Sequence, residues 1–164
     1  MEDAEKTELD EFLARTQALL ADCEEWSVGL GLRVTHGETA INEERHGPYR
    51  APTLILDDSH GKRMAQIVPF GASILGAWGR VDVVSEYSKQ EKIVYLSAGG
   101  PVIGTRIQAV ENGPVEQSSH TMLRGVEGEG WYWVSPFPLR RAYPLTREVF
   151  VDLLGAVSGH DFQL

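Results

Sequence analysis

The first thirty residues carry apolar positions at the spacing of an amphipathic helix. Apolar side chains recur every three or four residues and form a stripe of Leu9, Phe12, Leu13, Leu19, Leu20 and Cys23. Thr7, followed three residues later by Asp10, matches a capping box, in which two side chains satisfy free backbone amides at a helix start. The pattern predicts a helix that begins near Thr7 and ends before Gly29.

The period of the pattern changes to two after this helix. Apolar side chains alternate with glycine and polar residues in a run formed by Val28, Leu30, Leu32 and Val34. Such alternation predicts a half-buried strand. The next segment, 36–52, is polar and contains two prolines, and it predicts a long loop or a short helix.

Further strand-like runs follow along the chain. They cover 53–57, 62–68, 78–87, 91–97, 102–110 and 131–135. Short turns between them indicate hairpins, and the three runs between 78 and 110 predict a meander of neighbouring strands. A polar, glycine-containing segment at 111–130 predicts a second long loop, and one short strand near 120–124 is an open alternative within it.

A second amphipathic helix is predicted near the end of the sequence. Thr146 matches a helix N-cap, and Gly159 matches a C-terminal cap. The order of elements predicts an α+β fold: a mostly antiparallel sheet of about six to seven strands, built from hairpins and a meander and flanked by an N-terminal and a C-terminal helix. A length of 164 residues fits a single domain over 1–164.

The charge balance narrows the classes of partner. Fifteen basic and 24 acidic side chains give a net charge of −9, which argues against nucleic-acid binding because phosphate contacts need clustered Lys and Arg. The longest uncharged run is too short for a membrane helix, and the acidic N-terminus lacks the features of an export signal. We therefore expect a cytoplasmic protein without membrane contact. Cys23, the single cysteine, fits a small buried apolar residue.

Two groups of residues are candidates for a binding surface. The first lies on the polar side of the alternating central strands, where arginines can recognise a carboxylate or phosphate beside a stacking ring; it comprises Trp78, Arg80, Asp82 and Arg106. The second combines aromatic and basic residues, the types most enriched at interface hot spots; it comprises Tyr132, Arg140 and Arg141. A solvated face and an aromatic core are the alternative interpretations.

Histidine and carboxylate residues are weaker candidates for metal ligands. They comprise His46, Asp57, Asp58 and His60. None of them follows a known ligand spacing, and the last three fit ordinary turn chemistry. We therefore expect neither a metal nor another cofactor.

These observations favour a non-enzymatic binding protein that contacts a macromolecular partner, for example an acidic adaptor or immunity-type protein that neutralises a basic toxin. Its net charge would steer association, and a small apolar anchor would hold the complex. A metal-dependent hydrolase that uses the loop His, Asp and Glu residues is one alternative, and a binder of a small anionic ligand is another. A homodimer through an unpaired edge strand stays open, since the sequence does not identify the edge.

Overall fold

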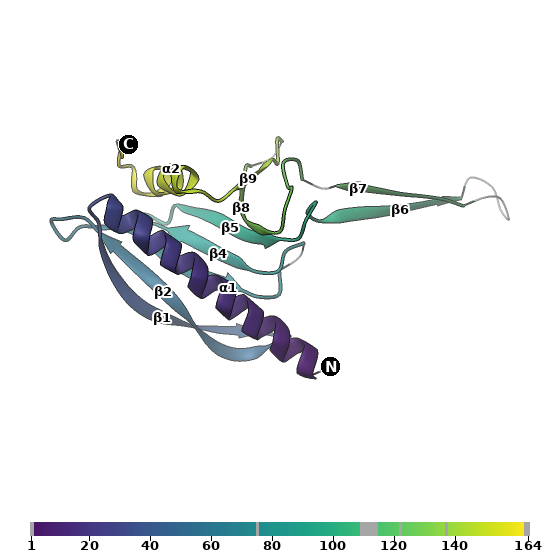
Figure 1. Ribbon diagram of the computed structural model, residues 1–164, viewed down its shortest axis with the longest axis horizontal. Helices are drawn as coiled ribbons and strands as arrows, with labels where there is room; N and C mark the ends of the chain where they lie inside the picture. The colour runs from purple at the N-terminus through teal and green to yellow at the C-terminus, as the bar shows by residue number, and fades with distance from the viewer. Residues whose placement is uncertain (1, 75, 109–114, 122, 137, 163–164) are drawn as a thin grey trace.

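The computed structural model describes residues 2–74, 76–108, 115–121, 123–136 and 138–162, and within 102–108 and 115–121 it describes the backbone alone. The elements are α1 (Glu2–Gly29), β1 (Arg33–Glu43), β2 (Gly47–Asp57), β3 (Arg63–Gly71), β4 (Arg80–Val84), β5 (Gln90–Leu96), β6 (Val102–Gln108), β7 (Val115–Thr121), β8 (Gly130–Val134), β9 (Ala142–Pro144) and α2 (Arg147–Ser158). An antiparallel sheet has the order β1-β2-β3-β4-β5-β8-β9, and β6 pairs with β7 separately. The predicted α+β fold is confirmed (Figure 1).

The N-terminal helix begins before its predicted start. α1 starts at Glu2, and the Thr7 hydroxyl donates a hydrogen bond to the Asp3 carbonyl at 2.8 Å inside the helix, so Thr7 is not its cap. The helix ends at Gly29, and the Leu32 amide then donates to the Ser27 carbonyl at 3.0 Å. Most of the predicted apolar stripe is buried against the sheet.

The prediction for residues 28–52 is wrong. Val28 lies in the last turn of α1, and the segment expected to be a long loop forms most of the β1–β2 hairpin. This hairpin is in unbroken register, from Arg33 opposite Asp57 to Glu43 opposite Gly47. No residue of β1 is fully buried, so the strand needs few apolar side chains and shows no apolar alternation.

The larger core lies between one face of the sheet and both helices. It unites buried side chains from α1, β2, β3, β4, β5 and α2: Leu19, Leu20, Cys23, Leu54, Leu56, Ile67, Val81, Val83, Ile93, Phe150, Leu153, Leu154 and Val157 are among its members. α2 has the predicted caps, because Thr146 accepts a hydrogen bond from the Val149 amide at 3.3 Å and Gly159 takes a left-handed φ of 72°.

A smaller apolar cluster lies on the opposite face of β5 and β8. Its buried members are Leu96, Leu123, Tyr132 and Ala142. Val94 and Val134 pack against this cluster and stay partly exposed. The second face of the sheet is therefore covered in part, by the chain around Leu123 rather than by a helix.

The predicted meander is wrong at its last step. β4 pairs with β5, but the next neighbour of β5 is β8, and β6 leaves the sheet to pair with β7. Figure 1 shows this two-stranded ribbon projecting from the end of the sheet. The predicted loop 111–130 thus contains β7, while 109–114 and 122 lie outside the described residues. An alternating apolar pattern predicts a strand, but it does not predict which strand pairs with it. The single-domain organisation stays a prediction.

The thiol of Cys23 is sealed in the larger core, as predicted. Its side chain is fully buried, and desolvation by this burial raises the pKa of the thiol. Ellman's reagent should therefore leave Cys23 unmodified in the native protein and modify it fully in concentrated urea. Rapid modification without denaturant would contradict this packing.

Gly79, just before β4, lies against Phe12 of α1. Its φ is 152°, and a Cβ built there lies 2.5 Å from Phe12 Cδ1. Gly79→Ala should therefore lower the free energy of unfolding by about 2–4 kcal/mol, because the ring must shift within a packed core. Urea unfolding followed by tryptophan fluorescence measures the loss. Gly29→Ala is the matched control, since nothing lies within 4 Å of its Cβ; an equal effect at both sites would refute this explanation.

Candidate functional site

The predicted binding residues Arg80 and Asp82 form a closed ion pair. They lie two apart on β4, so their side chains share one face of the sheet. Arg80 Nε and Nη2 donate to the two Asp82 carboxylate oxygens at 2.7 and 2.9 Å, and the guanidinium lies 3.9 Å from the centroid of the Phe70 ring. Asp82 is only 6% exposed, so the expectation that it faces outward for contact is wrong.

Three other predicted binding residues lie in different surroundings. Trp78 is 52% exposed in the segment before β4. Arg106 lies opposite Gln117 in the β6–β7 ribbon, outside the seven-stranded sheet, and its side chain lies outside the described part. Tyr132 is 4% exposed, and its hydroxyl donates to the Gly128 carbonyl at 2.6 Å, so its expected surface role is wrong.

Arg140 and Arg141 lie together in the segment before β9 but have different surroundings. The Arg141 amide donates to the Ser135 hydroxyl at 2.9 Å, and its guanidinium lies 5.8 Å from the Tyr143 ring centroid. Arg140 is exposed and lines a groove. Only one of the two predicted arginines therefore faces a cavity.

This groove has a volume of about 940 Å³. Its apolar lining comes from Ile74, Ala77, Val94, Leu96, Pro101, Leu123, Val134 and Pro136. Lys92 and Arg140 bring positive charge to it, and Gln90, Glu91 and Ser135 add polar groups. An apolar concavity with a few polar groups at its border is the usual composition of a binding site.

The pleat of β5 places the groove on the face that the helices leave open. Ile93 is fully buried in the core beneath the helices. Because successive side chains of a strand point to opposite faces, Lys92 and Val94 point away from that core. Val134 of β8, the strand that pairs with β5, extends the apolar floor across two strands.

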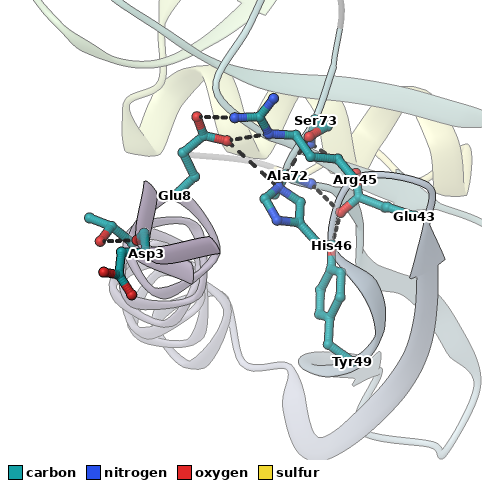
Figure 2. A network of polar contacts seen from close by, with 9 residues as sticks. Asp3, Glu8, Glu43, Arg45, His46, Tyr49, Ala72 and Ser73 are labelled. Carbon is teal, nitrogen blue, oxygen red and sulfur yellow. Dashed lines mark hydrogen bonds and ion pairs between the residues drawn. The ribbon is translucent and has the colours of Figure 1, made fainter. Parts of the chain in front are cut away.

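A polar network joins α1 to the sheet through Ser73, the chain neighbour of the groove residue Ile74 (Figure 2). Arg45, in the turn between β1 and β2, donates from Nε and Nη2 to the Glu8 carboxylate of α1, each at 2.8 Å. The neighbouring His46 side chain is 1% exposed, with its Nε2 3.1 Å from Ser73 Oγ and 3.8 Å from Glu8 Oε2. Three segments therefore meet at one buried ring.

Glu43 holds the segment after β3 in the same network. Its carboxylate accepts hydrogen bonds from the Tyr49 hydroxyl and from the amides of Ala72 and Ser73, at 3.0 and 2.8 Å for the amides. Burial opposes its charge, yet these donors hold the pKa of Glu43 below its ordinary value. Burial, followed by the bond to Glu43, raises the pKa of Tyr49.

A serine, a histidine and a glutamate lie together here without forming a nucleophile relay. In such a relay the carboxylate holds Nδ1 while Nε2 faces the serine, whereas Glu8 and Ser73 both approach Nε2 of His46. The amides of Ala72 and Ser73, which might stabilise an oxyanion, already bind Glu43. The geometry fits a structural role, in which the polar contacts hold α1, the β1–β2 turn and the segment after β3 together.

The candidate metal ligands are used for local structure. Asp57 accepts from Arg63 at 2.9 Å, and Asp58 accepts from the amides of His60 and Lys62 at 2.8 Å each. The pKa of Asp58 is lowered, chiefly by the bond from Lys62. Over the residues that the structure describes, no group of three His, Cys, Asp or Glu side chains is placed to hold a metal ion.

Most of the net negative charge lies on α1. Its sequence carries nine acidic and two basic side chains, or −7, against −9 for the whole chain. The acidic and basic side chains of the rest of the protein are thus nearly equal in number. The groove lies on the face of the sheet opposite this acidic helix. In the described part, no helix has the length and hydropathy to cross a bilayer.

Comparison of the chain with protein-family models, with curated proteins and with solved structures finds no match. The choice among functions therefore depends on the geometry of these two sites. Of the predicted binding residues, Arg140 lines the groove. Lys92 and Val94 also line it and were not predicted, because apolar residues occur on both faces of β5 and the pattern does not single out its second face.

Glu43→Gln tests the structural role of the polar network. The lowered pKa means that the Glu43 carboxylate contributes its full stability above pH 4.5, its ordinary pKa, and loses it as the pH falls through the lowered value. Wild-type stability should therefore fall more steeply over this acidic range than that of the variant. At neutral pH the substitution should cost about 1–3 kcal/mol, because the new amide cannot accept from both backbone amides.

Urea unfolding at neutral and acidic pH measures both effects. Glu44→Gln is the matched control, since Glu44 is an exposed neighbour in the same turn. Parallel pH profiles for wild type and Glu43→Gln would contradict the role assigned to Glu43.

Proposed function

We propose that the protein is a non-enzymatic binding protein that holds an extended segment of a partner protein in the groove over β5 and β8. The observation that carries the proposal is the composition of this groove. It has a volume of about 940 Å³, an apolar floor, and the cations Lys92 and Arg140 beside that floor. A partner segment with apolar side chains and an acidic group complements such a floor.

The position of the charges supports an acidic group in the partner segment. Among the ion pairs of the described residues, none includes Lys92 or Arg140. The acidic side chains of α1 lie with the helix layer on the other face of the sheet. A carboxylate in the groove therefore meets Lys92 and Arg140, while the acidic helix lies at a distance. Of the acidic groups on the sheet, Glu91 accepts a hydrogen bond from Trp133 Nε1 at 2.8 Å, and Asp82, opposite Lys92, is paired with Arg80.

The surroundings of the groove favour a protein partner over a small molecule. Trp78, next to the groove residue Ala77, is 52% exposed. A large exposed apolar side chain near a groove widens the surface that a partner buries. A small ligand would leave this ring in water.

The alternatives have less support. A hydrolase needs a group of ligands or a relay, and the described residues provide neither arrangement. A small-anion site at Arg80 is weakened because Asp82 already neutralises that arginine. An acidic immunity-type protein would present α1 to a basic partner, and a comparison of acidic with basic peptides separates that version from the groove.

Fluorescence polarisation with labelled peptides tests the proposal. The probes are pools of apolar octapeptides that carry either two glutamates or two lysines. The wild type should prefer the acidic pool, and Val94→Glu should weaken binding by about tenfold or more, because it places a carboxylate in the apolar floor.

Val28→Glu is the matched control, since Val28 is an apolar residue that is 59% exposed on α1. Lys92→Glu should remove the preference for acidic peptides. Preference for the basic pool, or equal binding by the wild type and Val94→Glu, would disprove the groove as the site.

A further inference from the structure

β1 is a long edge strand of the seven-stranded sheet. It spans 11 residues, and β2 is its only neighbour in the sheet order of the described chain. The opposite edge, β9, has three residues. A long edge with unpaired backbone groups is a ready template for another strand.

β1 carries the charged residues Arg33, Glu38 and Glu43 but lacks three other common protections of an edge, which are proline, lysine and a bulge. Its sequence, RVTHGETAINE, contains neither proline nor lysine. Its ladder with β2 runs over all 11 residues without a register shift, so no bulge twists the edge away. These features suit an edge that is paired in the working protein.

We propose that β1 pairs antiparallel with β1 of a second copy, about a two-fold axis at Gly37. In this register His36 lies opposite the partner's Glu38, and by symmetry Glu38 lies opposite the partner's His36. Thr35 lies opposite the partner's Thr39, and Val34 opposite the partner's Ala40. A histidine therefore faces a carboxylate, with which it can share a hydrogen bond, on each side of the axis, and small uncharged side chains face each other beyond these pairs.

Neighbouring registers are less favourable. An axis at Glu38 would place two glutamates directly opposite each other, where like charges repel. An axis at His36 would place Val34 opposite the partner's Glu38 and two histidines on the axis. The register about Gly37 thus avoids opposed glutamates and places each Glu38 opposite a histidine that can donate a hydrogen bond to it.

The side chains that pair across this interface are accessible. His36 contacts Glu24 at 2.9 Å and is 67% exposed, and Glu38 contacts Arg50 at 2.9 Å and is 63% exposed. Each has one partner within its own copy and an exposed side that a second copy can reach.

Few charged side chains of α1 lie beside the proposed axis. A two-fold axis perpendicular to the sheet places both copies of α1 on the same face. The helix residues that line the small cavity beside His36 and Gly37 are Gln17, Leu20, Ala21 and Glu24, and Glu24 is paired with His36 of its own copy at 2.9 Å. α1 carries no acidic side chain from Phe12 to Ala21, and the one charged residue of that stretch, Arg15, is basic.

Cysteine cross-linking tests both the dimer and its register. Thr35→Cys and Thr39→Cys, mixed in equal amounts and oxidised, should give a disulfide-linked dimer, because directly opposite positions approach the Cβ spacing of a disulfide. Either variant alone should give none, since its own copies lie four positions apart. The native Cys23 is fully buried, and thermal unfolding confirms that each variant folds.

Charge exchange tests the pairing of His36 with Glu38. Analytical ultracentrifugation should show a wild-type dimer of twice the chain mass. His36→Glu should weaken the dimer by about tenfold, because the new glutamate of each copy then lies opposite the partner's Glu38, which gives two pairs of like charges. The double variant His36→Glu with Glu38→His should restore the affinity, and His60→Glu, an equal charge change at an exposed turn, should leave it unchanged.

A monomer at every concentration, a dimer that does not form the mixed disulfide, or a double variant as weak as His36→Glu would each overturn the proposal. None of these results depends on the groove over β5 and β8, so this proposal and the proposed function stand or fall separately.

Discussion

Burial of one face of the sheet beneath two helices is the interaction on which the rest of the structure depends. Residues such as Val81, Val83 and Ile93 alternate into this core, where both helices meet them. The pleat then directs every intervening side chain to the other face. The Arg80–Asp82 pair and the groove beside Val94 both lie there for this one reason.

The parts of the fold that local chemistry specifies were predictable. α2 is the clearest case, because its apolar stripe and both of its caps lie within a few residues of one another. The β1–β2 hairpin was missed because none of β1 is buried and polar side chains suffice at an edge. The pairing of β5 with β8 joins distant segments, and no local pattern reports it.

The candidate site was predictable only in part. Arg140 lies at the groove as a basic residue in an aromatic segment suggested, but Arg80 and Tyr132 are occupied within the protein. An arginine with an aspartate two positions away on a strand can neutralise itself, and a tyrosine hydroxyl can anchor a loop. Composition identifies such residues, but their contacts within the folded protein determine whether they can bind a ligand.

The position of α1 has a consequence for the order in which the chain acquires structure. Phe12 lies against Gly79, and Arg15 stacks on the Tyr95 ring at 4.3 Å, so this helix is completed by strands made much later. The core beneath it also takes Phe150 and Leu154 from the last helix. During synthesis the apolar stripe of α1 therefore stays uncovered until β4, β5 and α2 have been made, which favours slow and concerted folding.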